Sequence, residues 1–235
     1  MYQAKTWLIG LTVLATGCQP VGSEQFSTKR FDAQISFTAD GATREVVAEA
    51  RILVDGFPVT LVGGDYLTAR GGGESRVLLP VMDDDGPTGT YSVTFQQTGE
   101  NVIFETSLNR DAGAVAPTST VAMPESFEIE EYADKPSRSG GFTVRWSKPS
   151  ADPMWIALDS AGCLSESVEV EVTNPVDGFH YLVPGLLETS DLMVGDVCVI
   201  YVDLFRRVEG QLDDAYGAGT VVGQQWAQVN VATQP

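Results

Sequence analysis

The chain has 235 residues, of which 32 are acidic and 14 basic, and its formal net charge at pH 7 is -18. A body with this charge is repelled by nucleic-acid phosphates and by anionic lipid headgroups, so the composition argues against a nucleic-acid partner. Hydrophobic residues make up 43% of the chain and aromatic residues 9%, which is enough for one large or two small hydrophobic cores.

An export signal is predicted over residues 1–17. Lys5 is the only charged residue before the apolar run TWLIGLTVLATG. This run of about a dozen residues is shorter than the roughly 20 residues that a membrane-spanning helix needs, so we expect it to be cleaved. It ends in LATGC, residues 14–18, which resembles the lipobox of bacterial lipoprotein signals.

The lipobox resemblance implies that Cys18 becomes the first residue of the mature chain and carries a diacylglyceryl group, usually with an N-acyl chain. Stable anchoring takes at least two acyl chains, which this modification supplies. Gln19 follows the cysteine where an Asp would mark inner-membrane retention, so the outer membrane is favoured in a Gram-negative cell. The alternative is an ordinary secretory signal with an unrelated cysteine nearby.

Residues 18–30 are expected to form the lipidated N-terminus and a flexible tether, because QPVGSEQFSTKR is polar and lacks periodicity. Residues 31–128 then show a period of two, and FDAQISFTA places Phe31, Ile35 and Phe37 on one face. The segment 43–54 contains helix-favouring residues, but its Val and Ile content favours a strand. Short alternating strands separated by Gly, Pro and Asp predict a first antiparallel β-sandwich.

Residues 129–235 continue the same pattern. GFTVRW alternates inward Phe142, Val144 and Trp146 with outward polar residues. The stretch SVEVEV has one charged face and is expected near a sheet edge. VCVIYVDLF, residues 197–205, is apolar on both faces, as in a central strand covered on both sides. TVVGQQWAQVNV supplies a last strand.

A second resemblance concerns this half of the chain. GFTVRWSKPS is similar to the second strand of fibronectin type III modules, in which an alternating strand ends in a Trp and is followed by a Pro. YLVPGLL and the following DVCVIYVDL resemble the later turn and long apolar strand of that family. The resemblance implies an immunoglobulin-like domain in the broad sense. The predicted fold class is therefore all-β, with two tandem antiparallel β-sandwich domains.

The cysteines agree with an exported protein. If Cys18 is acylated, Cys163 and Cys198 remain as an even pair in a compartment where disulfides persist. A bridge between them closes a loop of about 36 residues and would stabilise the fold by about 3 to 4 kcal/mol. Two buried free thiols are the alternative.

No catalytic, cofactor or metal site is predicted. His180 is the only histidine and has no G-x-S-x-G nucleophile to accompany it, so a structural or surface role is the simpler interpretation. One histidine and two cysteines are too few for a typical zinc site. The acidic loops Asp83–Asp85 and Asp213–Asp214 leave a calcium ion as an open question, although Asp-rich turns are common without one.

Two functions remain open at this stage. The favoured one is a non-enzymatic envelope lipoprotein, held at the membrane by its lipid, whose sandwiches bind a partner or act as a spacer. The other is an accessory or catalytic component acting on cell-wall or extracellular polysaccharide, with Trp155, Trp226 and Tyr216 stacking on sugar rings. Strand alternation places most aromatics inward, so burial of the two tryptophans would argue against the second function.

Overall fold

The computed structural model describes residues 21–234 except 42, 85, 97–101, 112–116, 133, 138, 161–163 and 188–196, so Cys18 and Cys163 lie outside the described residues. Within this part, no helix is long and apolar enough to cross a membrane. Three short 3-10 helices occur, η1 (Ser23–Gln25), η2 (Thr28–Arg30) and η3 (Pro175–Asp177). The strands are β1 (Val21–Gly22), β2 (Asp32–Asp40), β3 (Glu45–Val54), β4 (Phe57–Thr60), β5 (Tyr66–Gly71), β6 (Glu74–Val77), β7 (Leu79–Asp83), β8 (Gly86–Gln96), β9 (Ile103–Asn109), β10 (Thr118–Ala122), β11 (Ile129–Tyr132), β12 (Phe142–Trp146), β13 (Met154–Ser160), β14 (Val168–Glu171), β15 (Phe179–Leu182), β16 (Cys198–Glu209) and β17 (Ala218–Thr233).

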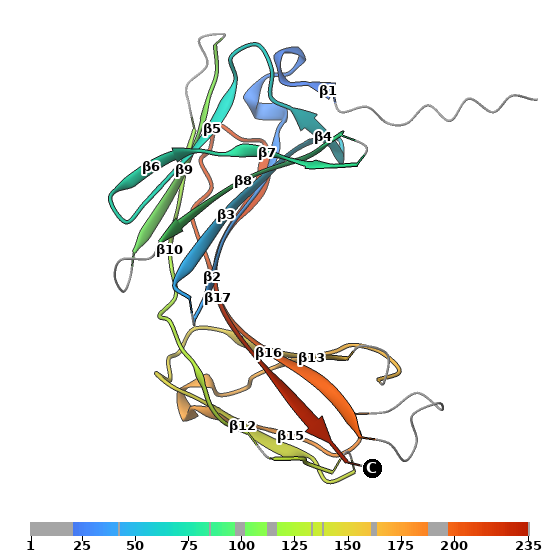
Figure 1. The fold of residues 1–235 in the computed structure, drawn as a ribbon. Coiled ribbons are helices and arrows are strands. Elements are labelled where there is room, and N and C mark those ends of the chain that lie inside the picture. The colour runs from blue at the N-terminus through green and yellow to red at the C-terminus, as the bar shows by residue number, and fades with distance from the viewer. Residues whose placement is uncertain are drawn as a thin grey trace, which may run out of the picture.

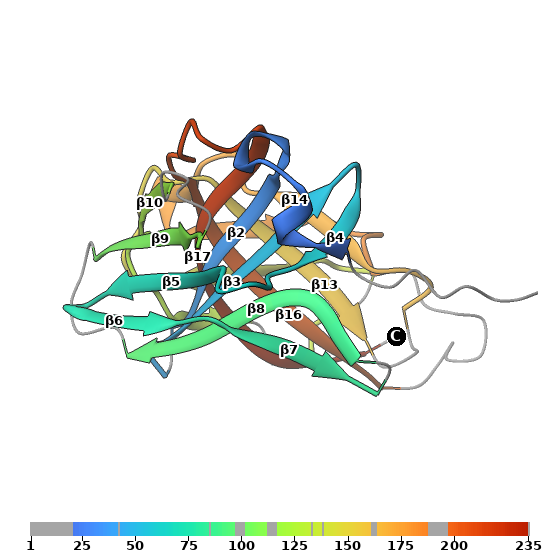
Figure 2. The ribbon, with the colours of Figure 1, turned by 90° about the horizontal axis from the view of Figure 1, so that it is seen from above.

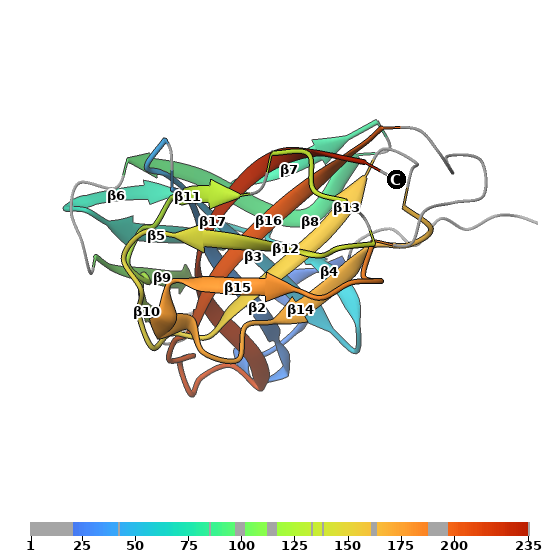
Figure 3. The same ribbon diagram turned by 90° about the horizontal axis from the view of Figure 1, so that it is seen from below.

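The described strands form one large sheet and two smaller ones. The large sheet has the order β1-β4-β3-β2-β17-β16-β13-β14, and β8 also pairs with β3 and with β7. The smaller sheets, β10-β9-β5-β6 and β11-β12-β15, cover the two ends of the large sheet (Figure 1). Seen from above and below, their strands cross those of the large sheet at an angle (Figures 2 and 3). The predicted all-β sandwich fold is confirmed.

Each smaller sheet encloses its own hydrophobic core against the large sheet, which divides the molecule into a first and a second lobe. The first core contains Phe37, Phe95 and Phe104, and the ring of Phe104 contacts the other two. The second core contains Trp146 and Phe127. Alternation explains much of both cores, because the side chains that the sequence places on the apolar faces of β2 and β12 are the buried ones.

Two long strands run through both lobes. β17 has 16 residues and extends over about 50 Å at 3.3 Å per residue. Its first part, Ala218–Trp226, pairs in parallel with β2, while β16 pairs along its whole length. Val221 belongs to the first core and Val231 to the second, and both point to the same side of the sheet.

This arrangement differs from the division expected at residues 128 and 129. The segment 210–226 belongs to the first lobe, since Tyr216 and Val221 are part of its core. The parallel pairing of β17 with β2 also departs from a purely antiparallel sandwich. Between the two cores, the inward positions of β17 hold Gly223 and the fully buried Gln225 in place of large apolar residues, so the apolar alternation is interrupted where the strand passes from one core to the other.

The segment 21–30, expected as part of a flexible tether, is folded. Val21 pairs in parallel with Val59 of β4, and Ser23 is fully buried. Arg110 donates hydrogen bonds to the carbonyl oxygens of Ser23 (2.8 Å) and Phe26 (2.9 Å). The prediction of a tether was wrong here because the partner for these backbone groups comes from a residue more than 80 positions away.

Other local expectations are met. The segment 43–54 forms the strand β3 from Glu45 onward, and β14 is the last strand of the large sheet, as its charged face predicted. Asp55 and Gly56 both have positive φ angles, the geometry of a tight hairpin turn between β3 and β4. Cys198 begins β16, where it is buried and disulfide-bonded.

Candidate binding face on the large sheet

One face of the large sheet packs against the two smaller sheets, and no described sheet covers the other, which we call the open face. The ribbon is bent into an arc, with the smaller sheets on its outer side and the open face on its inner side (Figure 1). Because the strands are in register, the open-face side chains form rows across them. In order along the sheet, the rows are Thr220, Gln34, Arg51 and Thr90; Glu209, Val222, Ser36, Glu49 and Ser92; Arg207, Gln224, Thr38, Val47 and Thr94; Glu171, Trp155, Phe205, Trp226 and Asp40; Glu169, Ala157, Asp203 and Gln228; and Asp159, Tyr201 and Asn230.

Three aromatic side chains occupy one of these rows. Trp155 on β13 lies opposite Phe205 on β16, which lies opposite Trp226 on β17. All three are partly exposed. The guanidinium of Arg207 lies over the Trp155 ring, 5.3 Å from its centroid. Neither tryptophan is therefore a core residue, in contrast to what strand alternation favours.

Tyr216, the third aromatic residue considered for sugar stacking, does not join this row. It is 2% exposed and belongs to the first core. Its hydroxyl has no hydrogen-bond partner among the described residues. Burial, and then the charge of Asp213, raise the pKa of this phenol. The core packing that the sequence favoured over sugar stacking is therefore confirmed for Tyr216.

Hydrogen-bonded polar pairs flank the aromatic row on both sides. On one side, Nε of Arg207 donates to Oε1 of Gln224 at 3.0 Å. On the other side, Nε2 of Gln228 donates to Oδ1 of Asp203 at 2.7 Å. Burial raises the pKa of Asp203 and the carboxylate of Asp159 raises it further, while the bond from Gln228 acts in the opposite direction.

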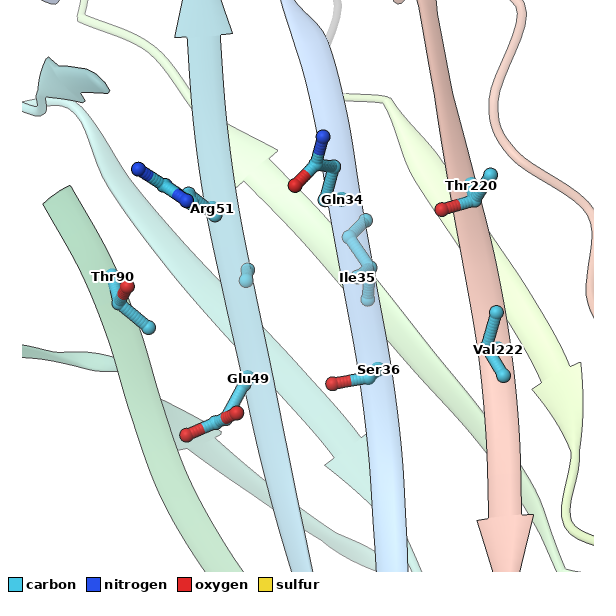
Figure 4. A pocket seen from close by; sticks show the side chains of 9 residues that line it. Gln34, Ile35, Ser36, Glu49, Arg51, Thr90, Thr220 and Val222 are labelled. Atoms are coloured by element: carbon cyan, nitrogen blue, oxygen red, sulfur yellow. The ribbon is translucent and has the colours of Figure 1, made fainter. Parts of the chain in front are cut away.

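A shallow hollow of about 260 Å³ lies further along the open face. The side chains that line it rise from four neighbouring strands, with Glu49 and Arg51 on β3, Gln34 on β2 and Thr220 on β17 (Figure 4). Its lining combines the apolar residues Ile35, Ala50 and Val222 with polar side chains that include the oppositely charged Glu49 and Arg51. This hollow and the aromatic row lie on the same face of the same sheet.

The remaining residues singled out from the sequence do not gather into a chemical site. His180 lies on β15 opposite Val144, and burial lowers its pKa. Asp213 accepts hydrogen bonds from the backbone N–H groups of Thr118 and Ala215, as a turn residue does. Over the described part of the chain, no three His, Cys, Asp or Glu side chains lie close enough to hold a metal ion. Asp85 and Cys163 lie outside that part.

The exposed outward side of β16 does not follow from its sequence pattern. Its apolar character on both faces predicted a strand covered on both sides, and this was wrong for the described sheets, because Val199 is 48% exposed and Phe205 is partly exposed. The signal was present in the sequence, since Phe205, Trp155 and Trp226 are aromatic residues at positions where an open sheet face usually carries polar ones. Arg207, Gln224, Asp203 and Gln228 carry no such signal, because polar residues are ordinary on an exposed strand face.

Comparisons with known proteins do not place the chain in a family. No family of proteins matches its sequence, and no curated protein does so. Among solved structures, it is similar to a chimeric titin Z1Z2 functionalized with a KLER exogenous peptide from decorin. The two chains share 10% sequence identity at a TM-score of 0.27, over 87% of this chain and 96% of that one. A likeness at this level carries no conclusion about function.

Proposed function

We propose that the protein is a lipid-anchored component of the cell envelope, at the outer membrane, that binds a partner on the open face and has no catalytic activity of its own. The observation that carries the binding role is the open face itself, where three partly exposed aromatic side chains form a row on an uncovered sheet. Large aromatic side chains left in contact with water on a rigid scaffold are typical of binding surfaces.

The anchoring part of the proposal rests on Cys18. Three Cα–Cα steps separate Cys18 from Val21, and they span at most about 11 Å. Since Val21 is already part of β1, a lipid on Cys18 would hold the first lobe close to the membrane. In Figure 1, β1 lies at the end of the first lobe that is remote from the second lobe. The second lobe would therefore extend away from the bilayer.

The two remaining cysteines fit the same proposal. The chain has three cysteines, and Cys198 is disulfide-bonded. With Cys18 acylated, Cys163 is the cysteine left to pair with it within one chain. We propose this pairing, which tethers the segment before β14 to the start of β16.

Fractionation of cells that make the Cys18→Ser variant tests the anchoring. We expect the unaltered protein in the membrane fraction, with the mass of an acylated N-terminal cysteine, and the variant in the soluble fraction or as uncleaved precursor. Gln19→Ser is the matched control, because it alters the neighbouring residue and leaves the thiol in place. Membrane retention of Cys18→Ser after its signal has been cleaved, or an unmodified thiol in the mature protein, would contradict the proposal.

A further inference from the structure

The aromatic row has the dimensions of a short stretch of sugar chain. Trp155, Phe205 and Trp226 lie on three neighbouring strands. Adjacent strands are about 4.8 Å apart, so the row extends over about 10 Å, which is comparable to the length of a disaccharide. Flat aromatic rings provide apolar surface for the C–H faces of sugar rings, and a row on a sheet presents that surface at fixed positions.

The polar pairs on either side of the row suit sugar hydroxyl groups. The Arg207–Gln224 pair and the Asp203–Gln228 pair each lie two residues along their strands from the row, at a distance of about 7 Å. Each pair is held by one hydrogen bond, and its guanidinium, amide and carboxylate groups carry further donors and acceptors. Because the pair bond already orders these side chains, less entropy is lost when they bind a ligand.

The charge of the open face restricts the ligand further. Its rows contain seven carboxylates and two guanidinium groups, and the whole chain has a net charge of -18. Polyanions are repelled by such a surface, which removes acidic polysaccharides and nucleic acids from consideration. A polymer of neutral or amine-bearing sugars complements both the aromatic row and the carboxylates.

We propose that the open face binds a polysaccharide without acidic groups. Its sugar rings stack on Trp155, Phe205 and Trp226, and its hydroxyl groups bond to the two flanking pairs. The hollow lined by Gln34, Glu49 and Arg51 lies on the same face, two to three rows away along the strands, and is not part of this contact. This proposal rests on the proposed use of the open face as a binding surface, and it adds the class of ligand.

Titration of the detergent-solubilised full-length protein with three polysaccharides tests it. Hydroxyethyl cellulose serves as the neutral probe, chitosan oligosaccharides as the amine-bearing probe and alginate as the acidic probe. We expect binding of the neutral or the amine-bearing probe, with a change in tryptophan fluorescence, and none of alginate. Trp155→Ala and Trp226→Ala should each weaken binding at least tenfold, while Trp155→Phe and Trp226→Phe retain part of it.

Phe179→Ala is the matched control. Phe179 is an exposed aromatic on β15, outside the open face, with Arg145 over its ring at 5.1 Å, much as Arg207 lies over Trp155. Its replacement should leave binding unchanged. If a tryptophan variant fails to fold, Gln224→Ala and Gln228→Ala test the same site at exposed polar positions, each with an expected loss of about three- to tenfold.

Three outcomes would overturn the proposal. They are the absence of binding to both non-acidic probes, tight binding of alginate, and unchanged binding in the folded Ala variants. If sugars fail to bind and crosslinking captures a protein on the open face, the ligand of this face is a protein and not a polysaccharide. None of these results bears on the fractionation of Cys18→Ser, so failure of the sugar proposal and failure of the anchoring proposal are distinguishable.

Discussion

Arg206 and Arg207 are neighbours in the sequence and lie on opposite sides of one strand. The side chain of Arg207 is exposed on the open face, whereas that of Arg206 is 0% exposed. Arg206 donates to the carbonyl oxygens of Glu125 at 3.0 Å and Lys148 at 2.7 Å, and its guanidinium lies over the Phe127 ring. It therefore ties the connection between the lobes to β16.

We expect Arg206→Ala to destabilise the protein by about 3 to 5 kcal/mol, because it removes the donors of two carbonyl groups and opens a cavity where a fully buried side chain was. Arg206→Met fills most of the volume, so it should lower the free energy of unfolding by less than Arg206→Ala does. The difference between the two variants separates the lost packing from the lost hydrogen bonds. Arg207→Ala is the control and should change stability by about 0.5 kcal/mol or less. Urea unfolding measures all three, and equal losses for Arg206→Ala and Arg207→Ala would contradict this account.

Asp203 gives a prediction about pH. Burial and the neighbouring Asp159 raise the pKa of Asp203 above its ordinary value of 3.8, so its ionisation disfavours the folded state. We expect Asp203→Asn, which keeps the acceptor for Gln228, to increase the free energy of unfolding at pH 7. The gain should shrink as the pH falls through the folded-state pKa and disappear below 3.8.

Denaturant unfolding at a series of pH values checks this expectation. Glu169→Gln is the control, since it removes one exposed negative charge from the same face and reports on the general effect of net charge. If Asp203→Asn and Glu169→Gln increase the free energy of unfolding equally at every pH, the effect comes from the net charge and not from the burial of Asp203.

At the scale of elements, a buried ion pair helps to hold the segment 21–30 on the first lobe. Arg110 and Asp65 contact each other at 3.0 Å, with 4% and 5% of their side chains exposed. Arg110 also donates to Thr28 and to the carbonyl groups of Ser23 and Phe26. The ion pair thus positions the donors that hold β1, η1 and η2 on the first lobe.

Asp65→Asn should destabilise the protein by about 3 to 5 kcal/mol, because Arg110 stays buried without its counter-charge. It should also speed tryptic cleavage after Lys29 and Arg30, as the segment is released. Asp55→Asn is the control, because it removes the carboxylate of the exposed Arg30–Asp55 pair. It should lower the free energy of unfolding by about 0 to 1 kcal/mol. Unchanged proteolysis in Asp65→Asn would show that the segment is held by other contacts.

Strands with a clean alternation could be predicted from the sequence, and their partners could not. Phe31 to Ala39 and Phe142 to Trp146 are buried at every second residue, as expected, because the period of two follows from strand geometry alone. The pairing of β17 with β2 joins residues about 185 positions apart, and no local pattern encodes it. Likewise, the aromatic row exists only because β13, β16 and β17 are in register. The sequence singled out Trp155 and Trp226 as candidate binding residues, but it could not show which residues lie beside them on the neighbouring strands.

At the scale of the whole molecule, the two lobes share strands. They differ in how much each depends on residues from the other half of the chain. The first lobe contains segments from both ends of the chain, since Ala218–Trp226 pairs with all nine residues of β2. The second lobe takes most of its core from residues after 128, with Phe127 as the exception. Division of the chain at residue 128 should therefore damage the first lobe far more than the second.

We expect a fragment of residues 31–128 to be insoluble or to unfold without cooperativity. It lacks Tyr216 and Val221 from its core and exposes the whole edge of β2, which invites pairing with other chains. A fragment of residues 129–235 should keep a cooperative transition in urea. Circular dichroism and urea unfolding of both fragments, beside the full chain, provide the comparison.

A second chain, in which the missing strand is added back to the first lobe, tests whether the fragment 31–128 fails because it lacks the contacts of β17. Thr120 and Gln211 exchange both backbone hydrogen bonds in an antiparallel bridge, which places residues 124 and 207 near each other. Residues 21–124 joined through a short Gly-Ser turn to residues 207–226 restore β17 beside β2, as well as Tyr216 and Val221. This chain should recover a cooperative transition. If the fragment 31–128 already unfolds cooperatively with a denaturant slope appropriate to its length, then β17 is an addition to an independent first domain and not part of its core.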